Sequence, residues 1–182
     1  MNYKLDKQIV HNDVLRNSFI DLAIKTFDLS FKEWYRKGYW TDAYIPYALV
    51  SNNKVIANAS ANIIDLIWQG EPRRYIQIGT VMTDIDHRDK GLAGQLVREI
   101  LTDWQDKADA FFLFANPTTV DFYPKFGFER TAEHQYIMPV VPAAGDFRKL
   151  DMDQPEEVAR LQRYYQKSNP FSQLRVQDNF GL

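Results

Sequence analysis

The feature that most constrains the fold is a strand that passes, through a short loop, into an amphipathic helix. Residues 74–83 are expected to form the strand. The helix that follows is predicted by an apolar stripe at four-residue spacing, made by Leu92, Leu96, Ile100 and Trp104. Such a stripe is typical of a helix that lies on a sheet. The sequence from Thr83 to Leu96 therefore predicts a strand–loop–helix unit within a larger sheet.

The remaining helices and strands are predicted from hydrophobic spacing and turn residues. Helical spacing marks residues 14–27, with Asn12 or Asp13 as the cap, residues 31–37, which end near Gly38, and residues 117–127, opened by Pro117. Strands are expected at residues 43–50, 55–68, 110–115 and, as one or two strands, 128–140. The run 110–115 is continuously apolar, which is typical of a strand buried on both faces.

The expected strand at residues 55–68 changes its pattern part-way along. Its alternate apolar residues share one face as far as Ile63, and the apolar positions then move to the other phase from Ile64 onward. A bulge or bend near Ile63 would explain this shift. The turn residues 69–72 join this strand to residues 74–83, so the two are expected to form a hairpin.

The order of elements predicts an α/β domain on a mixed sheet, over residues 1–141. Residues 142–145 are expected to be a linker, followed by a short strand at 147–150 and a helix at 156–166 capped by Asp153, with Pro155 in its first turn. Residues 147–151 weakly echo residues 3–6. The extension 142–182 is thus either an arm that packs on the domain or on a neighbouring subunit, or the start of a truncated second half.

The composition excludes several classes of protein. The chain has no cysteine, so it has no disulfide framework, and it has no apolar run that predicts a signal peptide or a membrane span. Its net charge of −2, mixed along the chain, gives no footprint for nucleic acid. We expect a cytoplasmic protein without a metal site, and a homodimer is compatible with the sequence.

The loop at residues 83–96 has the properties of an anion site. The small residues Gly91, Ala93 and Gly94 allow close approach to the backbone. The first amides of a helix have no intrahelical partner, and the helix dipole favours negative charge at that end. Arg88 and Lys90 add positive charge. A pyrophosphate would suit such a site, and the alternative is an ordinary helix start behind an exposed charged loop.

Two motifs in this order resemble the signatures of the GCN5-related N-acetyltransferase (GNAT) family. Arg88-x-x-Gly91-x-Ala93 resembles the acyl-CoA signature, and Asn116, followed by Tyr123 before Gly127-Phe128, resembles the second signature. The resemblance covers residues 1–141. It implies a mixed, mostly antiparallel sheet flanked by helices, with splayed central strands, and transfer of an acetyl group from acetyl-CoA to an amine.

The resemblance also implies roles for individual residues. Val81, Met82 and Thr83 would pair their backbone with the pantetheine amides, and Asn116 would hold the cofactor or the splayed strand end. The pyrophosphate would be wrapped mainly by backbone N–H groups of Asp89, Lys90, Gly91, Leu92, Ala93 and Gly94, next to Arg88. A backbone N–H near Val81 or Met82 would bind the oxyanion. Tyr123 would be the general acid that protonates the leaving thiolate, unless it is only a core aromatic.

The residue that deprotonates the acceptor amine is not identified by the resemblance. Where one branch of the family has a Glu, this chain has Gln77, which cannot take a proton but can orient a water. Glu33, Asp42 and His134 are ionisable residues of the expected acceptor side, and each is more often an ordinary surface residue. Water chains are the alternative.

An aromatic-rich segment is expected to lie at the acceptor side. Its members are Phe31, Trp34, Tyr35, Tyr39, Trp40, Tyr44 and Tyr47. They form either a hydrophobic or cation-binding slot or plain core packing, and core packing is slightly favoured. Glu33, Asp42 and Asp28 lie nearby and would attract a cationic amine. The acceptor class stays open between a small-molecule amine and a peptide or protein amine.

Two further functions stay open. A catalytically silent acyl-CoA-binding or sensory module would keep residues 88–94 without the chemistry; Gln77 favours it and Tyr123 opposes it. An interaction protein would use the fold and residues 142–182 for assembly and bind no acetyl-CoA. A dinucleotide-binding domain is disfavoured, because no Gly-rich turn follows the first strand.

Overall fold

The computed structural model describes residues 2–135, 137, 139, 141, 144–146, 148–167 and 174–177. Its sheet has the order β1 (Lys4–Asp6), β2 (Tyr44–Ser51), β3 (Lys54–Trp68), β4 (Glu71–Thr83) and β5 (Ala110–Phe112). A further strand, β6 (Leu174–Gln177), pairs with β3 off this path. Only β4 and β5 run parallel among these described pairs. The mixed, mostly antiparallel sheet that the sequence predicts is therefore confirmed.

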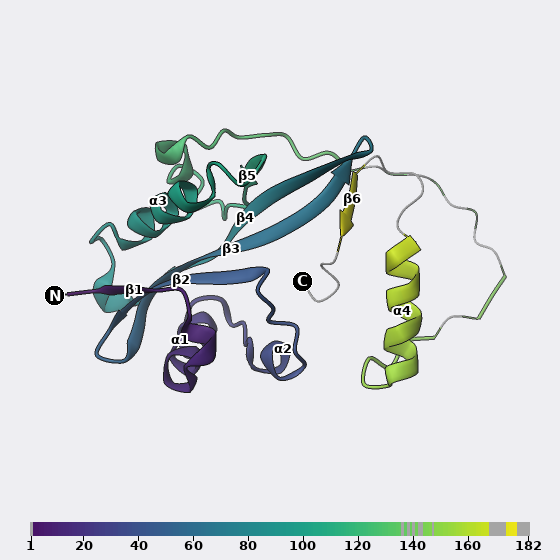
Figure 1. Cartoon of the computed structure of the whole chain (residues 1–182), viewed down its shortest axis with the longest axis horizontal. Helices are drawn as coiled ribbons and strands as arrows, with labels where there is room; N and C mark the ends of the chain where they lie inside the picture. Colours follow the sequence, from purple (N-terminus) through teal and green to yellow (C-terminus); the bar gives the residue numbers. More distant parts are fainter. Residues whose placement is uncertain are drawn as a thin grey trace.

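Helices cover both faces of this sheet. Helix α1 (Asp13–Phe27) and the short α2 (Lys32–Arg36) lie on one face, and α3 (Leu92–Trp104) lies on the other (Figure 1). Short 3-10 turns occur at η1 (Ile9–His11), η2 (Ile85–His87) and η3 (Tyr123–Phe126). Helix α4 (Pro155–Lys167) stands apart from these layers.

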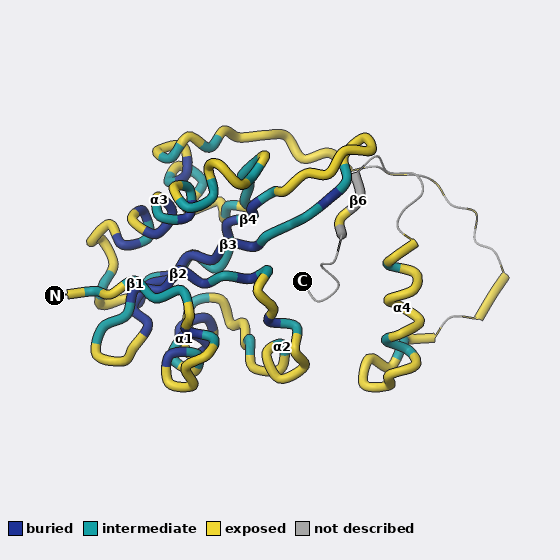
Figure 2. Tube along the Cα trace, viewed as in Figure 1, coloured by how far each residue is buried: buried dark blue, intermediate teal, exposed yellow. Residues whose placement is uncertain are grey.

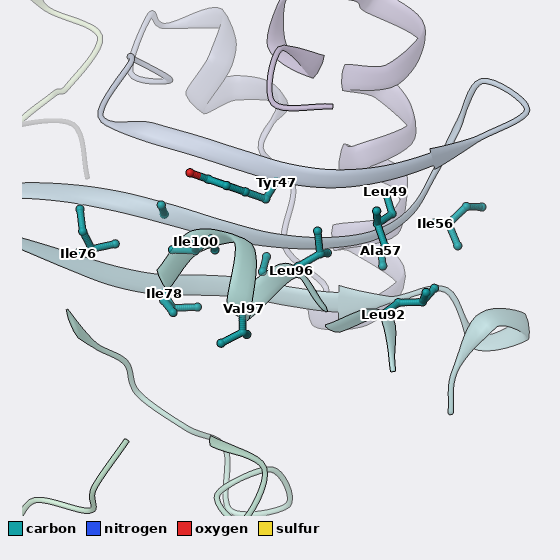
Figure 3. Close-up of a cluster of buried hydrophobic side chains, with 12 residues drawn as sticks. Tyr47, Leu49, Ile56, Ala57, Ile76, Ile78, Leu92, Leu96, Val97 and Ile100 are labelled. Carbon is teal, nitrogen blue, oxygen red and sulfur yellow. The ribbon is translucent and has the colours of Figure 1, made fainter. Parts of the chain in front are cut away.

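Two apolar cores hold the layers together. One core lies between the sheet and α3, where Leu92, Leu96 and Ile100 meet Ile76 and Ile78 (Figure 3). The other lies between the sheet and α1 and includes Phe19, Trp40 and Tyr44. The predicted stripe of α3 thus faces the sheet, and its last member, Trp104, is partly buried and donates to the Tyr47 hydroxyl of β2 at 3.1 Å.

The helix and hairpin ends follow from local chemistry. Asn12 is the N-cap of α1, because its Oδ1 accepts the N–H groups of Val14 and Leu15 at 3.0 and 3.2 Å. Helix α1 ends at Phe27, and its C-cap, Asp28, has a left-handed backbone. Two-residue turns close both hairpins, with positive φ at Asn52 and Asn53 in one and at Gln69 and Gly70 in the other.

The predicted bulge near Ile63 is wrong. The β3–β4 register is continuous from Ser60 opposite Gly79 to Trp68 opposite Glu71, and it shifts instead between Asn58 and Ser60. The extra residue is therefore on β4, at Thr80, whose φ is 49°. The sequence pattern was misleading because residues 55–62 are buried on both faces of the sheet, whereas the outer part of the hairpin is more exposed (Figure 2). Alternation of residue types in 55–62 therefore does not distinguish a buried face from an exposed one.

Three predictions after residue 109 are corrected. The strand predicted at 110–115 covers only Ala110–Phe112, and it is half-buried. The prediction was too long because a run of apolar residues also occurs in loops whose rings pack together, as those of Phe112 and Phe114 do with centroids 5.9 Å apart. The helix opened by Pro117 is a series of turns that ends in η3. No strand occurs at residues 128–135, 137 and 139, and residues 136, 138 and 140 lie outside the described residues.

The C-terminal extension is predicted in part. Helix α4 confirms the helix at 156–166, but its first accepting carbonyl belongs to Gln154. The carboxylate of Asp153 instead pairs with Lys37, with Nζ 2.7 Å from Oδ1, so the predicted cap is wrong. Residues 148–150 form no strand, and residue 147 lies outside the described residues, as do residues 142 and 143 of the predicted linker. The domain division at residue 141 stays a prediction.

No helix in the described part of the chain is both long and apolar enough to span a membrane.

Candidate active site

The central strands separate at one end of the sheet. Strands β4 and β5 pair only through the register Tyr75–Ala110, Ile76–Phe111 and Gln77–Phe112. Beyond Gln77, β4 continues to Thr83 and pairs with β3. On its other side, residues 78–83 have no strand partner among the described residues. This is the predicted splay, and it leaves an open strand edge whose N–H and C=O groups can pair with a ligand.

A buried hydrogen-bond network fixes the bulge beside this open edge. The hydroxyl of Tyr44 donates to Thr80 Oγ1 at 2.8 Å, and Ser60 Oγ donates to the Tyr44 hydroxyl at 2.9 Å. The amide of Asn58 donates to Ser60 Oγ and to the carbonyl of Thr80 at 2.9 and 3.0 Å. A non-glycine residue with positive φ is strained, and this network holds it in place. Burial raises the pKa of Tyr44, so its phenol stays neutral.

Sequence reasoning missed this network. Its signal is visible in retrospect, because Asn58, Ser60 and Asn62 are polar residues at alternate positions in an otherwise apolar strand. All three are buried on the face of β3 that points toward α1 and α2.

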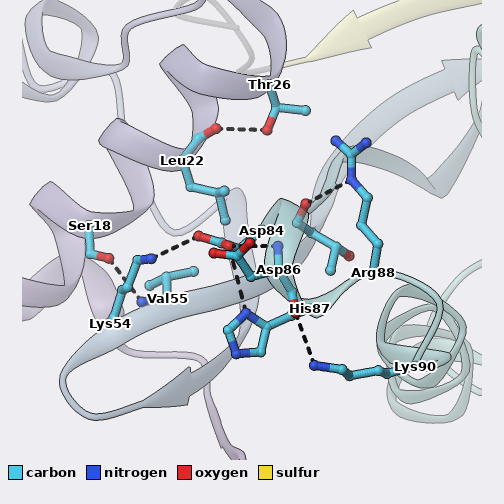
Figure 4. A network of polar contacts seen from close by, with 11 residues as sticks. Ser18, Leu22, Thr26, Lys54, Val55, Asp84, Asp86, His87, Arg88 and Lys90 are labelled. Carbon is cyan, nitrogen blue, oxygen red and sulfur yellow. Dashed lines mark hydrogen bonds and ion pairs between the residues drawn. The ribbon is translucent and has the colours of Figure 1, made fainter.

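The loop after β4 is held at its base by Asp84, which is 6% exposed. Its carboxylate accepts the N–H of Asp86 at 3.2 Å and pairs with Lys54 Nζ at 2.8 Å, and the bond from Lys54 holds the pKa of Asp84 below its usual value (Figure 4). The exposed side chains of Arg88 and Lys90 bond back to the carbonyls of Thr83 and Asp86, at 3.5 and 3.1 Å. The loop therefore has a fixed shape with two cations at its surface.

Helix α3 begins with free amides next to this loop. Gly91 is the N-cap, with φ 73°, and no side chain caps the helix. The first intrahelical bond runs from the N–H of Gln95 to the Gly91 carbonyl at 3.0 Å. The preceding amides of Leu92, Ala93 and Gly94 are thus without intrahelical acceptors, as an anion site requires.

Gly94 has a second explanation. A Cβ at this position would lie 3.1 Å from Cζ of Phe126, so the glycine favours the close packing of η3 on the helix. That small residues serve the approach of a ligand stays a prediction for Gly91, Ala93 and Gly94, and local structure also favours glycine at two of them, through the positive φ of Gly91 and the packing at Gly94.

Tyr123 begins η3 and is 9% exposed. Its ring packs on Phe122 and Phe128, with centroids 5.1 and 6.1 Å away, and burial raises the pKa of its phenol. The residue also lines a pocket of about 850 Å³ between β5 and residues 128–133. Tyr123 is thus both a packed aromatic and a lining residue, so packing does not remove it as an acid.

The other predicted cofactor residues lie on two sides of the splay. Val81 and Thr83 are half-buried on the open part of β4, and Met82 is buried in the core under α1. Asn116 is exposed, and its carbonyl accepts the N–H of Thr119 at 2.9 Å. The pocket that Tyr123 lines includes no residue of β4 or of the first turn of α3.

The aromatic segment is mainly core. Phe31, Trp34, Trp40 and Tyr44 make ring contacts with one another, most of them also with Phe19. Tyr47 faces the opposite core, where its hydroxyl donates to Asp103. These ring contacts favour core packing over an acceptor slot for the aromatic segment, which is the interpretation that the sequence slightly favoured.

The ionisable residues of the expected acceptor side are at the surface. Glu33 pairs with Arg36, with Oε2 2.7 Å from the guanidinium, and that bond lowers the pKa of Glu33. Asp28, Asp42 and His134 are exposed. None of these four residues has a described interaction with the hydrogen-bond network around Thr80.

The fold and the site together define a class of acetyltransferase. Residues 12–131 match the acetyltransferase (GNAT) domain family. The chain belongs to this family, which supports acetyl transfer as its activity.

Solved structures share the fold at low identity. Glucosamine-6-phosphate N-acetyltransferase from Arabidopsis thaliana is 18% identical, with a TM-score of 0.60 over 76% of this chain and 99% of that one. A putative acetyltransferase from Agrobacterium tumefaciens is 17% identical (TM-score 0.57, 76% and 100% covered). A predicted acetyltransferase from Clostridium acetobutylicum, solved with acetyl-CoA, is 19% identical (TM-score 0.51, 75% and 95%). No curated protein sequence matches the chain.

Proposed function

We propose that the protein transfers the acetyl group of acetyl-CoA to a primary amine by direct attack of the amine on the thioester. The observation that carries this proposal is the open edge of β4 leading into the uncapped amides of α3. The strand edge suits the pantetheine amides, at Val81, Met82 and Thr83, and the helix start suits the pyrophosphate. Asn116 would hold the cofactor from the far side of the splay.

The bulge at Thr80 supports the placement of the thioester. A bulge turns successive N–H groups out of the strand ladder, and one near Val81 is then free to bind the oxyanion that forms when the amine attacks. The C–N bond forms, and the C–S bond then breaks. The amine nitrogen loses a proton to water, and the thiolate takes a proton from the phenol of Tyr123.

The protonation state of Tyr123 is compatible with the role of general acid. Its raised pKa keeps the phenol protonated throughout the neutral range, so a proton is available when charge develops on sulfur.

The acceptor is proposed only as a class, a primary amine of a small molecule or a peptide, and the cytoplasmic location stays a prediction. A catalytically silent acyl-CoA-binding module is the second candidate, favoured by one observation: Gln77 stands on β4 at the mouth of the splay without a carboxylate.

Thiol release tests the choice between them. The protein would be mixed with acetyl-CoA and a panel of amines, and free thiol measured with a disulfide reagent. An acetyltransferase releases thiol in proportion to the acetylated amine. A protein that binds acetyl-CoA but gives no thiol above the rate without enzyme would be the silent module.

A further inference from the structure

A buried amide at the mouth of the splay has an unused oxygen. Asn62 of β3 is 8% exposed and lies directly opposite Gln77 of β4 and Tyr44 of β2. Its Nδ2 is 3.5 Å from Gln77 Oε1, which is a long hydrogen bond. Its Oδ1 is buried and has no hydrogen-bond partner among the described residues. A buried carbonyl oxygen without a donor is costly, so a donor from a ligand or a water is expected there.

A glycine on β4 packs closely against this amide. A Cβ on Gly79 would lie 3.2 Å from Asn62 Nδ2, so the glycine makes room for the amide one residue before the bulge at Thr80. The indole N–H of Trp40, whose ring is 5.3 Å from that of Tyr44, is also buried without a partner among the described residues. Asn58 Oδ1, at the bulge itself, is a third such atom, so three buried polar atoms without a described partner lie around Tyr44 and the bulge where the thioester is proposed to sit.

This part of the site is electrically neutral. Gln77 and Asn62 carry no charge, and β5 contributes only Ala110, Phe111 and Phe112. From β2 the titratable group is Tyr44, whose pKa burial raises. The charged residues of α2 are Lys32, Glu33 and Arg36, which are all exposed, and Glu33 pairs with Arg36. The described interactions bring no carboxylate, imidazole or lysine to the amide pair, so nothing here takes a proton from an ammonium group.

We propose that Asn62 Oδ1 accepts a hydrogen bond from the acceptor amine, and that the neutral Asn62–Gln77 pair selects amines that are already substantially unprotonated near neutral pH. An α-amino group of the peptide type fits this requirement, and a lysine-type alkylamine does not. The inference rests on the proposed function and deepens it. The nitrogen lone pair forms the C–N bond, the C–S bond breaks, and the excess proton on nitrogen goes to water.

The size of the selection follows from the amines themselves. An α-amino group has a pKa of about 7.8 and a lysine side chain about 10.4. At pH 7.5 the unprotonated fractions are therefore about one third and about one in 800, which differ roughly 270-fold.

The test compares alanine amide with Nα-acetyl-lysine amide, using thiol release at pH 6.5–9.5. In the wild-type protein we expect kcat/KM to favour alanine amide by roughly 100-fold at pH 7.5, and to rise tenfold per pH unit below the pKa of each amine. Asn62→Leu should lower kcat/KM for alanine amide by about 10-fold or more, with unchanged affinity for acetyl-CoA. Asn17→Leu, on the exposed side of α1, is the matched control and should change neither.

A second variant, Gln77→Glu, tests the neutrality of the pair and leaves the buried amide of Asn62 in place. It puts a carboxylate at the half-buried position 77. We expect it to raise kcat/KM for Nα-acetyl-lysine amide at pH 7.5 by about 10-fold or more and to make kcat/KM less dependent on pH. Equal wild-type rates for the two amines, or full activity of Asn62→Leu, would overturn this inference alone. Failure of the wild-type protein to bind acetyl-CoA, or to release thiol with either amine, would overturn the proposed function and this inference with it.

Discussion

Tyr123 is the residue for which the sequence left two interpretations, a general acid or a core aromatic, and the structure is compatible with both. It packs against Phe122 and Phe128, yet it also lines a pocket, and its phenol stays protonated because burial raises its pKa. The local motif led to the prediction of an acid at Tyr123, which stays a prediction. The sequence also left packing open for this residue, but it could not identify the rings that Tyr123 contacts, which depend on how residues 122–128 fold.

Removal of the Tyr123 hydroxyl tests the general acid. Tyr123→Phe keeps the ring and its packing, so we expect the free energy of unfolding and the affinity for acetyl-CoA to change little. The rate of thiol release should fall by about 100-fold, because general acid catalysis typically contributes about 10²–10⁴. Steady-state kinetics and calorimetric binding measure the two quantities. An unchanged rate would leave Tyr123 as a packing residue, with water as the acid.

Asp84 is a residue that composition and spacing did not single out, since its burial and its bond to Lys54 arise only when β3 and the loop after β4 meet. We expect Asp84→Asn to lower the free energy of unfolding at pH 7 by about 1–2 kcal/mol, because it weakens a bond to a charged group. The expected loss of stability is small because Lys54 is half exposed, and solvent weakens an ion pair at such a position.

The pH dependence of that difference has a definite sign. The folded-state pKa of Asp84 is lowered, first by the bond from Lys54, so the carboxylate contributes stability above the unfolded pKa of about 3.9. That contribution is lost as the pH falls through the folded pKa. Urea unfolding should therefore give a constant difference between wild type and Asp84→Asn above about pH 5 and a smaller one near pH 3. A difference that grows toward acid would contradict the bond.

At the scale of elements, the start of α3 was the most predictable part of the molecule. A strand, a loop of small residues and a four-residue stripe are all local signals, and the structure has the helix from Leu92 to Trp104 with Gly91 as its N-cap. The bulge at Thr80 was not predictable in this way, because it is defined by the register of β4 against β3. The shortening of β5 likewise depends on which strands lie beside it.

Substitutions at Gly91 test whether this helix start binds phosphate. Gly91→Glu and Gly91→Gln share the same size and the same strain at a positive φ of 73°, so they should lose similar stability. Only Gly91→Glu adds a negative charge at the site. We expect it to abolish acetyl-CoA binding and Gly91→Gln to retain measurable affinity by calorimetry. Equal affinity for both variants would show that no anion binds there.

At the scale of the whole molecule, the layered domain and the C-terminal extension differ in how far the sequence specifies them. The sheet with α1 and α3 has two continuous cores, and its order of elements was predictable from periodicity. Strand β6, which pairs with the outer part of β3, was not, because residues 168–182 have no period and a short strand is defined by its partner. The division at residue 141 remains a proposal.

The central claim, that this acetyltransferase takes its acetyl group from acetyl-CoA, is tested most directly by thermal unfolding with and without the donor. A ligand that binds only the native state adds about 2.7 kcal/mol at 100 times its Kd. For a chain of 182 residues this corresponds to a rise in Tm of about 5–10 °C. We predict that rise with acetyl-CoA and none with NAD at the same concentration. An unchanged Tm with acetyl-CoA, or an equal rise with NAD, would contradict the account.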